Sequence, residues 1–211
     1  MRQVFISFLL LFSIVSSAED LTVRVTGADQ KALPHSVVSL KPLSGQEFSR
    51  VDLKKDMTQQ QSLFTPFILA VQKGQKVQFP NKDPFRHHVY SFSKAKSFEL
   101  RLYGEDEEKH VVFEKAGVVA LGCNIHDNML AFVYVTEDPV YQKTNAEGST
   151  SFKGLPEGDY EMTVWHVDQK SRKPYKKMIT VNKQLQALSV EITIKKRRQI
   201  QKKRNASGGI Y

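Results

Sequence analysis

The chain has 211 residues, of which 40% are hydrophobic, and a formal net charge of +9 at pH 7. Arg2 and the seven basic residues of segment 195–204 account for eight of these charges, which leaves +1 for residues 19–194. A nearly neutral body lacks the basic surface that nucleic-acid binding requires, so we expect no nucleic-acid partner. The single cysteine, Cys123, excludes an internal disulfide.

Residues 1–18 have the pattern of a secretory signal peptide. Arg2 precedes the apolar run 4–15, and the small residues Ser16, Ser17 and Ala18 follow it. The run is shorter than the roughly 20 residues that a membrane-spanning helix needs. We therefore expect cleavage after Ala18 and export to the periplasm.

The body shows the strand-and-turn pattern of an all-β protein. Short apolar runs with period 2 are separated by Gly, Pro, Asn and Asp, at 21–25, 36–40, 67–71, 76–79, 88–92, 110–113, 117–123 and 129–135. Residues 52–64 are compatible with one short helix. Regular short strands of this kind predict a sandwich or barrel.

Charges and a proline at 137–139 predict a domain boundary, which gives a first domain at 19–136 and a smaller β-sandwich at 137–194. The second stretch resembles carboxypeptidase regulatory-like or transthyretin-like modules, on the motif G-x3-F-x2-LP-x-G-x-Y that begins at Gly148. Residues 195–211 form a basic tail that we expect to be flexible. It suits a weak contact with an anionic membrane or an acidic protein.

The chemistry is concentrated in the tract 122–129, GCNIHDNM, between two predicted strands. Cys123, His126 and Met129 offer a thiolate, an imidazole and a thioether from one short loop. These soft and intermediate donors suit copper better than magnesium, calcium or a catalytic zinc. Taken singly, each residue is more often structural, for example a buried cysteine or a methionine that fills a core gap. Their joint spacing favours a metal site.

A second imidazole is available in the tract 79–89, FPNKDPFRHHV, which contains His87 and His88. The arrangement N-x-D-x3-H followed by C-x2-H-x2-M resembles the cupredoxins, in particular the plastocyanin and amicyanin group. The resemblance implies His87 as the ligand, with His88 as the alternative. The strings HHVYSFS and LGCNIHDNM are also similar to bacterial exported cupredoxins labelled methylamine utilisation protein-like, although no residue here indicates methylamine.

The resemblance implies a Greek-key cupredoxin β-sandwich followed by a smaller β-sandwich module. It further implies one type 1 (blue) copper ion held by His87, Cys123, His126 and Met129. The protein would be a one-electron carrier and not an enzyme, with a redox partner protein docking near His126 on a rim of four residues, Pro84, Phe85, Ile125 and Asn128. The alternative is a non-enzymatic envelope interaction or copper-sensing protein built on the same scaffold.

Overall fold

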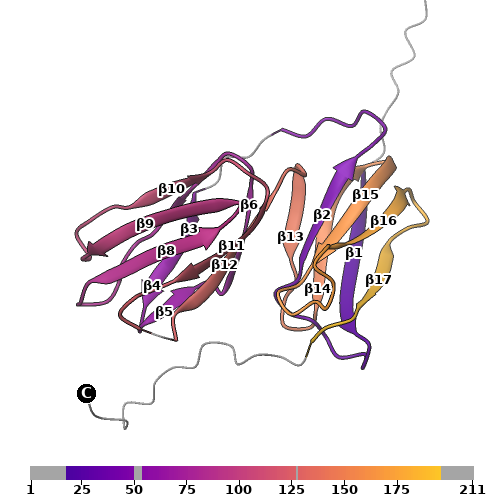
Figure 1. Cartoon of the computed structure of the whole chain (residues 1–211). Coiled ribbons are helices and arrows are strands. Elements are labelled where there is room, and N and C mark those ends of the chain that lie inside the picture. The colour runs from indigo at the N-terminus through magenta and orange to yellow at the C-terminus, as the bar shows by residue number, and fades with distance from the viewer. Residues whose placement is uncertain (1–17, 50–53, 127, 196–211) are drawn as a thin grey trace, which may run out of the picture.

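The structure, a computed structural model, describes residues 18–49, 54–126 and 128–195, and within these ranges it contains strands and no helix (Figure 1). Residues 1–17 of the expected signal peptide and all of the basic tail beyond Lys195 lie outside the described residues. The strands form two β-sandwiches, so the prediction of an all-β chain with two sandwiches is confirmed. No helix of the described residues is long and apolar enough to cross a membrane.

The larger sandwich contains ten strands from the middle of the chain. They are β3 (Lys55–Asp56), β4 (Thr58–Gln60), β5 (Leu63–Thr65), β6 (Ile68–Gln72), β7 (Gln75–Gln78), β8 (His87–Ser93), β9 (Lys96–Tyr103), β10 (His110–Phe113), β11 (Gly117–Gly122) and β12 (Leu130–Thr136). A five-stranded sheet, β6-β12-β11-β8-β9, faces the three-stranded sheet β10-β7-β3, and β4 and β5 form a separate hairpin. The chain passes repeatedly from one sheet to the other, as in a Greek key.

Alternation of buried and exposed residues explains these strands. In β11, Val119 and Leu121 are buried at 0% and 1% exposure, whereas the neighbouring Val118 is 36% exposed. Val77 and Phe113 from the opposite sheet complete the same core. The expectation that residues 52–64 could form a short helix was wrong. The described part of this segment forms the strands β3, β4 and β5.

The smaller sandwich combines the two ends of the described chain. It consists of β1 (Ala18–Gly27), β2 (Val37–Pro42), β13 (Val140–Lys143), β14 (Ser149–Pro156), β15 (Gly158–Trp165), β16 (Tyr175–Val181) and β17 (Ala187–Ile192). Its sheets have the orders β14-β1-β17 and β13-β2-β15-β16. The larger sandwich is therefore inserted between β2 and β13.

This arrangement corrects the predicted first domain, 19–136. Strand β1 pairs with β14 and β17, and β2 lies between β13 and β15, so both belong to the smaller sandwich. Leu21, Val25 and Leu40 are buried in its core. The division near 137 does fall between β12 and β13, which belong to different sandwiches.

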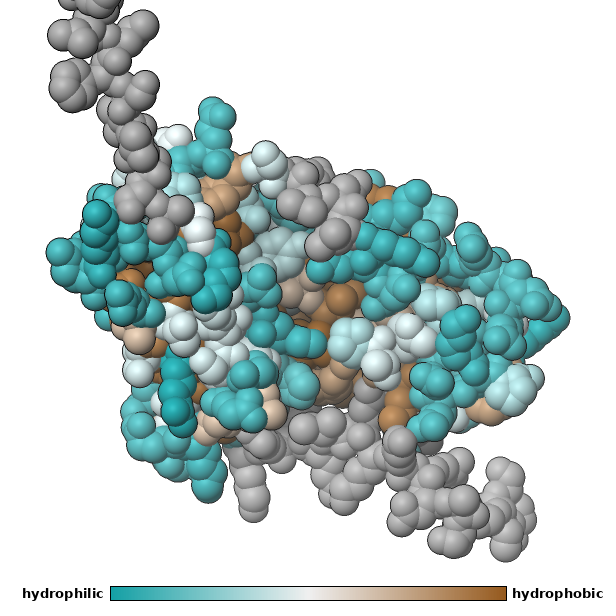
Figure 2. Space-filling view, turned by 180° about the vertical axis from the view of Figure 1, so that it is seen from behind, coloured by the Kyte–Doolittle hydropathy of each residue, from teal (hydrophilic) through white to brown (hydrophobic). Residues whose placement is uncertain are grey.

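The two sandwiches meet through an apolar cluster. Val37 and Trp165 of the smaller one pack against Ile68 and Tyr134 of the larger one. The rings of Tyr134 and Trp165 are stacked with centroids 4.9 Å apart. Seen from behind, the surface is mostly hydrophilic, and apolar colour gathers near the middle, where the sandwiches adjoin (Figure 2). The contact resembles a small hydrophobic core, which favours one fixed arrangement of the two units.

Candidate metal centre

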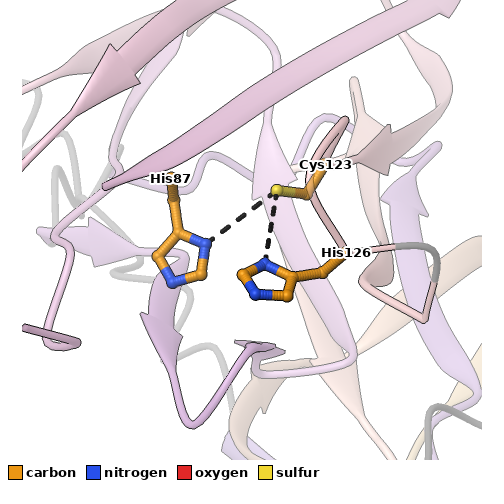
Figure 3. A group of neighbouring side chains, drawn as sticks. All are labelled: His87, Cys123 and His126. Atoms are coloured by element: carbon orange, nitrogen blue, oxygen red, sulfur yellow. Dashed lines mark hydrogen bonds between the residues drawn. The ribbon is translucent and has the colours of Figure 1, made fainter. Parts of the chain in front are cut away.

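Three of the four predicted ligands converge at one end of the larger sandwich (Figure 3). His87 is the first residue of β8, Cys123 directly follows β11, and His126 lies in the loop that leads to β12. Strands β8 and β11 are neighbours in the sheet, with Tyr90 paired to Gly122. This pairing brings a histidine 36 positions away in the sequence next to the cysteine loop.

The donor atoms have a spacing that fits a bound ion. The Cys123 sulfur lies 3.9 Å from His87 Nδ1 and 4.0 Å from His126 Nδ1, and the three atoms lie within 4.8 Å of one another. A metal–sulfur bond of about 2.3 Å and a metal–nitrogen bond of about 2.0 Å together exceed either separation. Both sulfur–nitrogen separations are therefore short enough for a bridging ion, and the three side chains form a candidate metal site.

Met129 directly precedes β12 and is 2% exposed. It belongs to the same buried cluster as Cys123, which is 5% exposed, and its backbone N–H donates to the carbonyl of His126 at 3.0 Å. This hydrogen bond links His126 and Met129, the last two named residues of the C-x2-H-x2-M motif. A buried thioether beside the cysteine loop is consistent with the weak axial ligand of a type 1 copper site.

The environment of Cys123 favours the thiolate. Burial opposes its ionisation, but a hydrogen bond with His87 and hydrogen bonds from the backbone N–H groups of His88 and Ile125 outweigh burial and lower the pKa of Cys123. Burial likewise disfavours a charged His87, whereas Cys123 and Asp83 raise the pKa of its imidazole. Since the thiolate is the form that binds metals, the loop is prepared for an ion.

The structure separates the two candidate histidines. His88 Nε2 lies 2.8 Å from Glu99 Oε1, and the His88 side chain is not part of the cluster with Cys123. Its contribution to the site is its backbone N–H, which hydrogen-bonds the cysteine sulfur. His87 is fully buried and faces the sulfur with Nδ1, so it is the histidine placed to bind.

Sequence reasoning missed the β4–β5 turn, which lies beside both imidazoles. Asp83 Oδ2 lies 2.8 Å from His87 Nε2, and its carboxylate also accepts the backbone N–H groups of Gln61 and Ser62. Ser62 Oγ lies 3.4 Å from His126 Nε2. The i, i+4 spacing of Asp83 and His87 is visible in the sequence, whereas the contact between Ser62 and His126 spans 64 positions and has no local signal.

The rim expected around His126 lies on the surface, and all four of its residues are exposed: Pro84, Phe85, Ile125 and Asn128. The Phe85 ring has its centroid 5.6 Å from that of His126 and 5.1 Å from that of His87. Phe85 and Ile125 are 43% and 48% exposed. The apolar side chains of Phe85 and Ile125 are therefore exposed to solvent near the half-buried imidazole of His126.

The known proteins that this chain resembles are solved structures. No protein-family profile matches the sequence, and no curated protein sequence matches significantly. Among solved structures, a Cu-containing nitrite reductase (NirK) from Thermus scotoductus SA-01 matches at 23% identity and a TM-score of 0.39, over 46% of this chain and 25% of that one. This chain thus spans about a quarter of that protein's length.

Two variants of amicyanin match with TM-scores of 0.37. One, a reduced Cu(I) form at pH 4, is 17% identical over 46% of this chain and 99% of its own. The other, an oxidised form, is 15% identical over 48% of this chain and 99% of its own. Strand order and the His-Cys-His cluster define the class, a cupredoxin-like β-sandwich with a candidate copper site, joined to a second β-sandwich.

Proposed function

We propose that this protein is a type 1 blue copper protein that carries single electrons between redox partners. The observation that supports this most is the convergence of Cys123 Sγ with the Nδ1 atoms of His87 and His126 at a buried end of a rigid sandwich. Bound copper would supply one-electron chemistry by alternating between Cu(I) and Cu(II).

The residues of the chain support this chemistry by holding their positions. His87 is fixed by a carboxylate, and Cys123 by two backbone N–H groups. Ligands that barely move between two oxidation states keep the reorganisation small, which makes electron exchange fast. With Met129 as the fourth donor the site would be closed, so we propose a carrier and not an enzyme, because catalytic metal centres keep an open position.

Copper reconstitution of the purified protein tests this proposal. We expect Cu(II) to give an intense visible thiolate charge-transfer band that is lost in Cys123→Ser and His87→Ala. The matched variant His88→Ala should keep the band, because that imidazole points toward Glu99. A colourless copper complex, or a band that survives Cys123→Ser, would contradict the proposed site.

Export to the periplasm is part of the proposal and rests on the pattern of residues 1–18. Mass spectrometry of the protein from a periplasmic extract should find a chain that begins at Glu19. We further propose that the redox partner is a protein that docks on the exposed Phe85 and Ile125 near His126. Phe85→Glu should slow electron exchange with that partner in a protein that still forms the blue copper complex.

A second candidate function, an interaction protein at the cell envelope, is favoured by one observation. The segment 168–173, whose exposed end 170–173 has three cations, is hydrogen-bonded to residues 193–195, where the basic tail begins, through Lys170 N–H to Thr193 O at 2.8 Å and Lys195 N–H to Asp168 O at 2.7 Å. Sedimentation with anionic lipid vesicles, against neutral vesicles and a chain truncated after Lys195, tests this function. Binding to anionic vesicles that depends on the tail would support it, and equal sedimentation with both lipids would contradict it.

A further inference from the structure

The turn between β4 and β5 has an unfavourable backbone conformation. The strand register pairs Gln60 with Leu63, so Gln61 and Ser62 form a two-residue turn. Their φ angles are 56° and 55°, in the left-handed region that favours glycine or asparagine. Two consecutive residues of other types in this region are costly, and such conformations persist only where surrounding contacts enforce them.

The enforcing contact is the carboxylate of Asp83. Oδ1 accepts the N–H of Gln61 at 2.6 Å, and Oδ2 accepts the N–H of Ser62 at 2.9 Å. The same Oδ2 lies 2.8 Å from His87 Nε2. Because Asp83 is only 5% exposed, water competes little for these hydrogen bonds. One buried carboxylate therefore holds both the strained turn and the first imidazole.

The β4–β5 turn also lies next to the imidazole of His126. Ser62 Oγ lies 3.4 Å from His126 Nε2, while His126 Nδ1 faces the Cys123 sulfur. A neutral imidazole that binds a metal through Nδ1 carries its proton on Nε2, and this N–H needs an acceptor. The Ser62 hydroxyl oxygen is placed to accept it, as Asp83 accepts the corresponding N–H of His87.

We propose that Ser62, held in the β4–β5 turn by Asp83, is a positioning residue of the copper site, through which Asp83 orients the imidazole of His126 as well as that of His87. This inference rests on the proposed function. Asp83 acts on His87 directly, and it acts on His126 through Ser62. The two imidazoles are held unequally, since His87 has a charged acceptor at 2.8 Å and His126 a neutral one at 3.4 Å. Ser62 therefore matters most for the partly exposed ligand.

The variant Ser62→Ala removes the hydroxyl and keeps an L-residue at the strained position, and Gln61→Gly is its matched control. Gln61 is exposed, and glycine keeps its N–H for Asp83 while it relieves the strain. We expect Ser62→Ala to lower the affinity for Cu(II), measured by competition with a chelator, by about tenfold. Gln61→Gly should raise the urea midpoint of the apo-protein and leave that affinity within about twofold.

A second readout needs no copper. In the apo-protein, NMR of ¹⁵N-labelled imidazoles should show that Ser62→Ala shortens the lifetime of the His126 Nε2 proton and that Gln61→Gly does not. If the natural protein forms the blue complex and Ser62→Ala matches it in copper affinity and proton lifetime, the positioning role of Ser62 is overturned and the proposed function stands. If the natural protein gives no blue band, the proposed function is overturned, whatever Ser62→Ala does to the lifetime.

Discussion

Replacing Asp83 by asparagine is the sharpest perturbation of the site. The carboxylate accepts N–H groups from Gln61, Ser62 and His87 at 2.6, 2.9 and 2.8 Å. An amide of the same size keeps one acceptor oxygen and presents an NH2 group in place of the other. At least one N–H then faces a donor, so Asp83→Asn should leave a buried hydrogen bond unmade.

The loss can be estimated from these contacts. A hydrogen bond to a charged group contributes about 1.5–3 kcal/mol, so losing one predicts a fall of about 2 kcal/mol in the free energy of unfolding. If the amide nitrogen faces His87, that ring keeps a hydrogen bond only by moving its proton to Nδ1, the atom that faces Cys123. We therefore expect copper affinity to fall by about 10–100-fold.

Urea unfolding of the apo-protein and chelator competition with Cu(II) measure the two effects. Asp106→Asn is the matched control, because it makes the same chemical change at an exposed position in the loop between β9 and β10. Equal urea midpoints and equal copper affinities for Asp83→Asn and the natural protein would refute the reasoning. A loss of similar size in Asp106→Asn would show a general effect of charge.

Two further predictions concern packing. Trp165→Ala removes the stack with Tyr134, so it should lower the free energy of unfolding by about 3–5 kcal/mol and separate the thermal transitions of the two sandwiches. A single, unchanged transition in calorimetry would contradict this prediction. Gly122→Ala should lower the free energy of unfolding, measured with a chemical denaturant, by about 1–3 kcal/mol, because the new Cβ would lie 2.7 Å from the Tyr90 ring. Gly104→Ala is the control, because its Cβ would meet nothing within 4 Å. Equal stability of the two variants would argue against a steric cause.

The sequence predicted the parts of the site that are local. Cys123, His126 and Met129 fall within seven residues between two alternating strands, so their common loop was visible from spacing alone. His87 required a resemblance, because no pattern in one sequence shows that β8 lies beside β11. The Ser62 contact was invisible for the same reason.

The domain assignment failed on a related physical point. Period-2 alternation shows that β1 and β2 have an apolar face, but it does not show which sheet they join. The pairing of β1 with β17 links residues more than 160 positions apart, such as Thr22 and Ala187. Sequence order suggested that neighbouring strands share a sandwich, and the inserted arrangement breaks that rule.

The insertion of one sandwich into the other has a consequence for how the chain folds. The larger sandwich, the inner unit, is continuous in sequence from β3 to β12. The smaller sandwich, the outer unit, is complete only when β17, near the end of the described chain, pairs with β1. Contacts of such long sequence separation form slowly, so we expect the inner unit to fold first and the outer one to close around its two ends. Those ends leave from the paired strands β2 and β13, where Leu40 lies opposite Val140. The larger sandwich is thus an inserted domain whose two ends connect to one pair of neighbouring strands, an arrangement that tolerates replacement of the inserted domain by another.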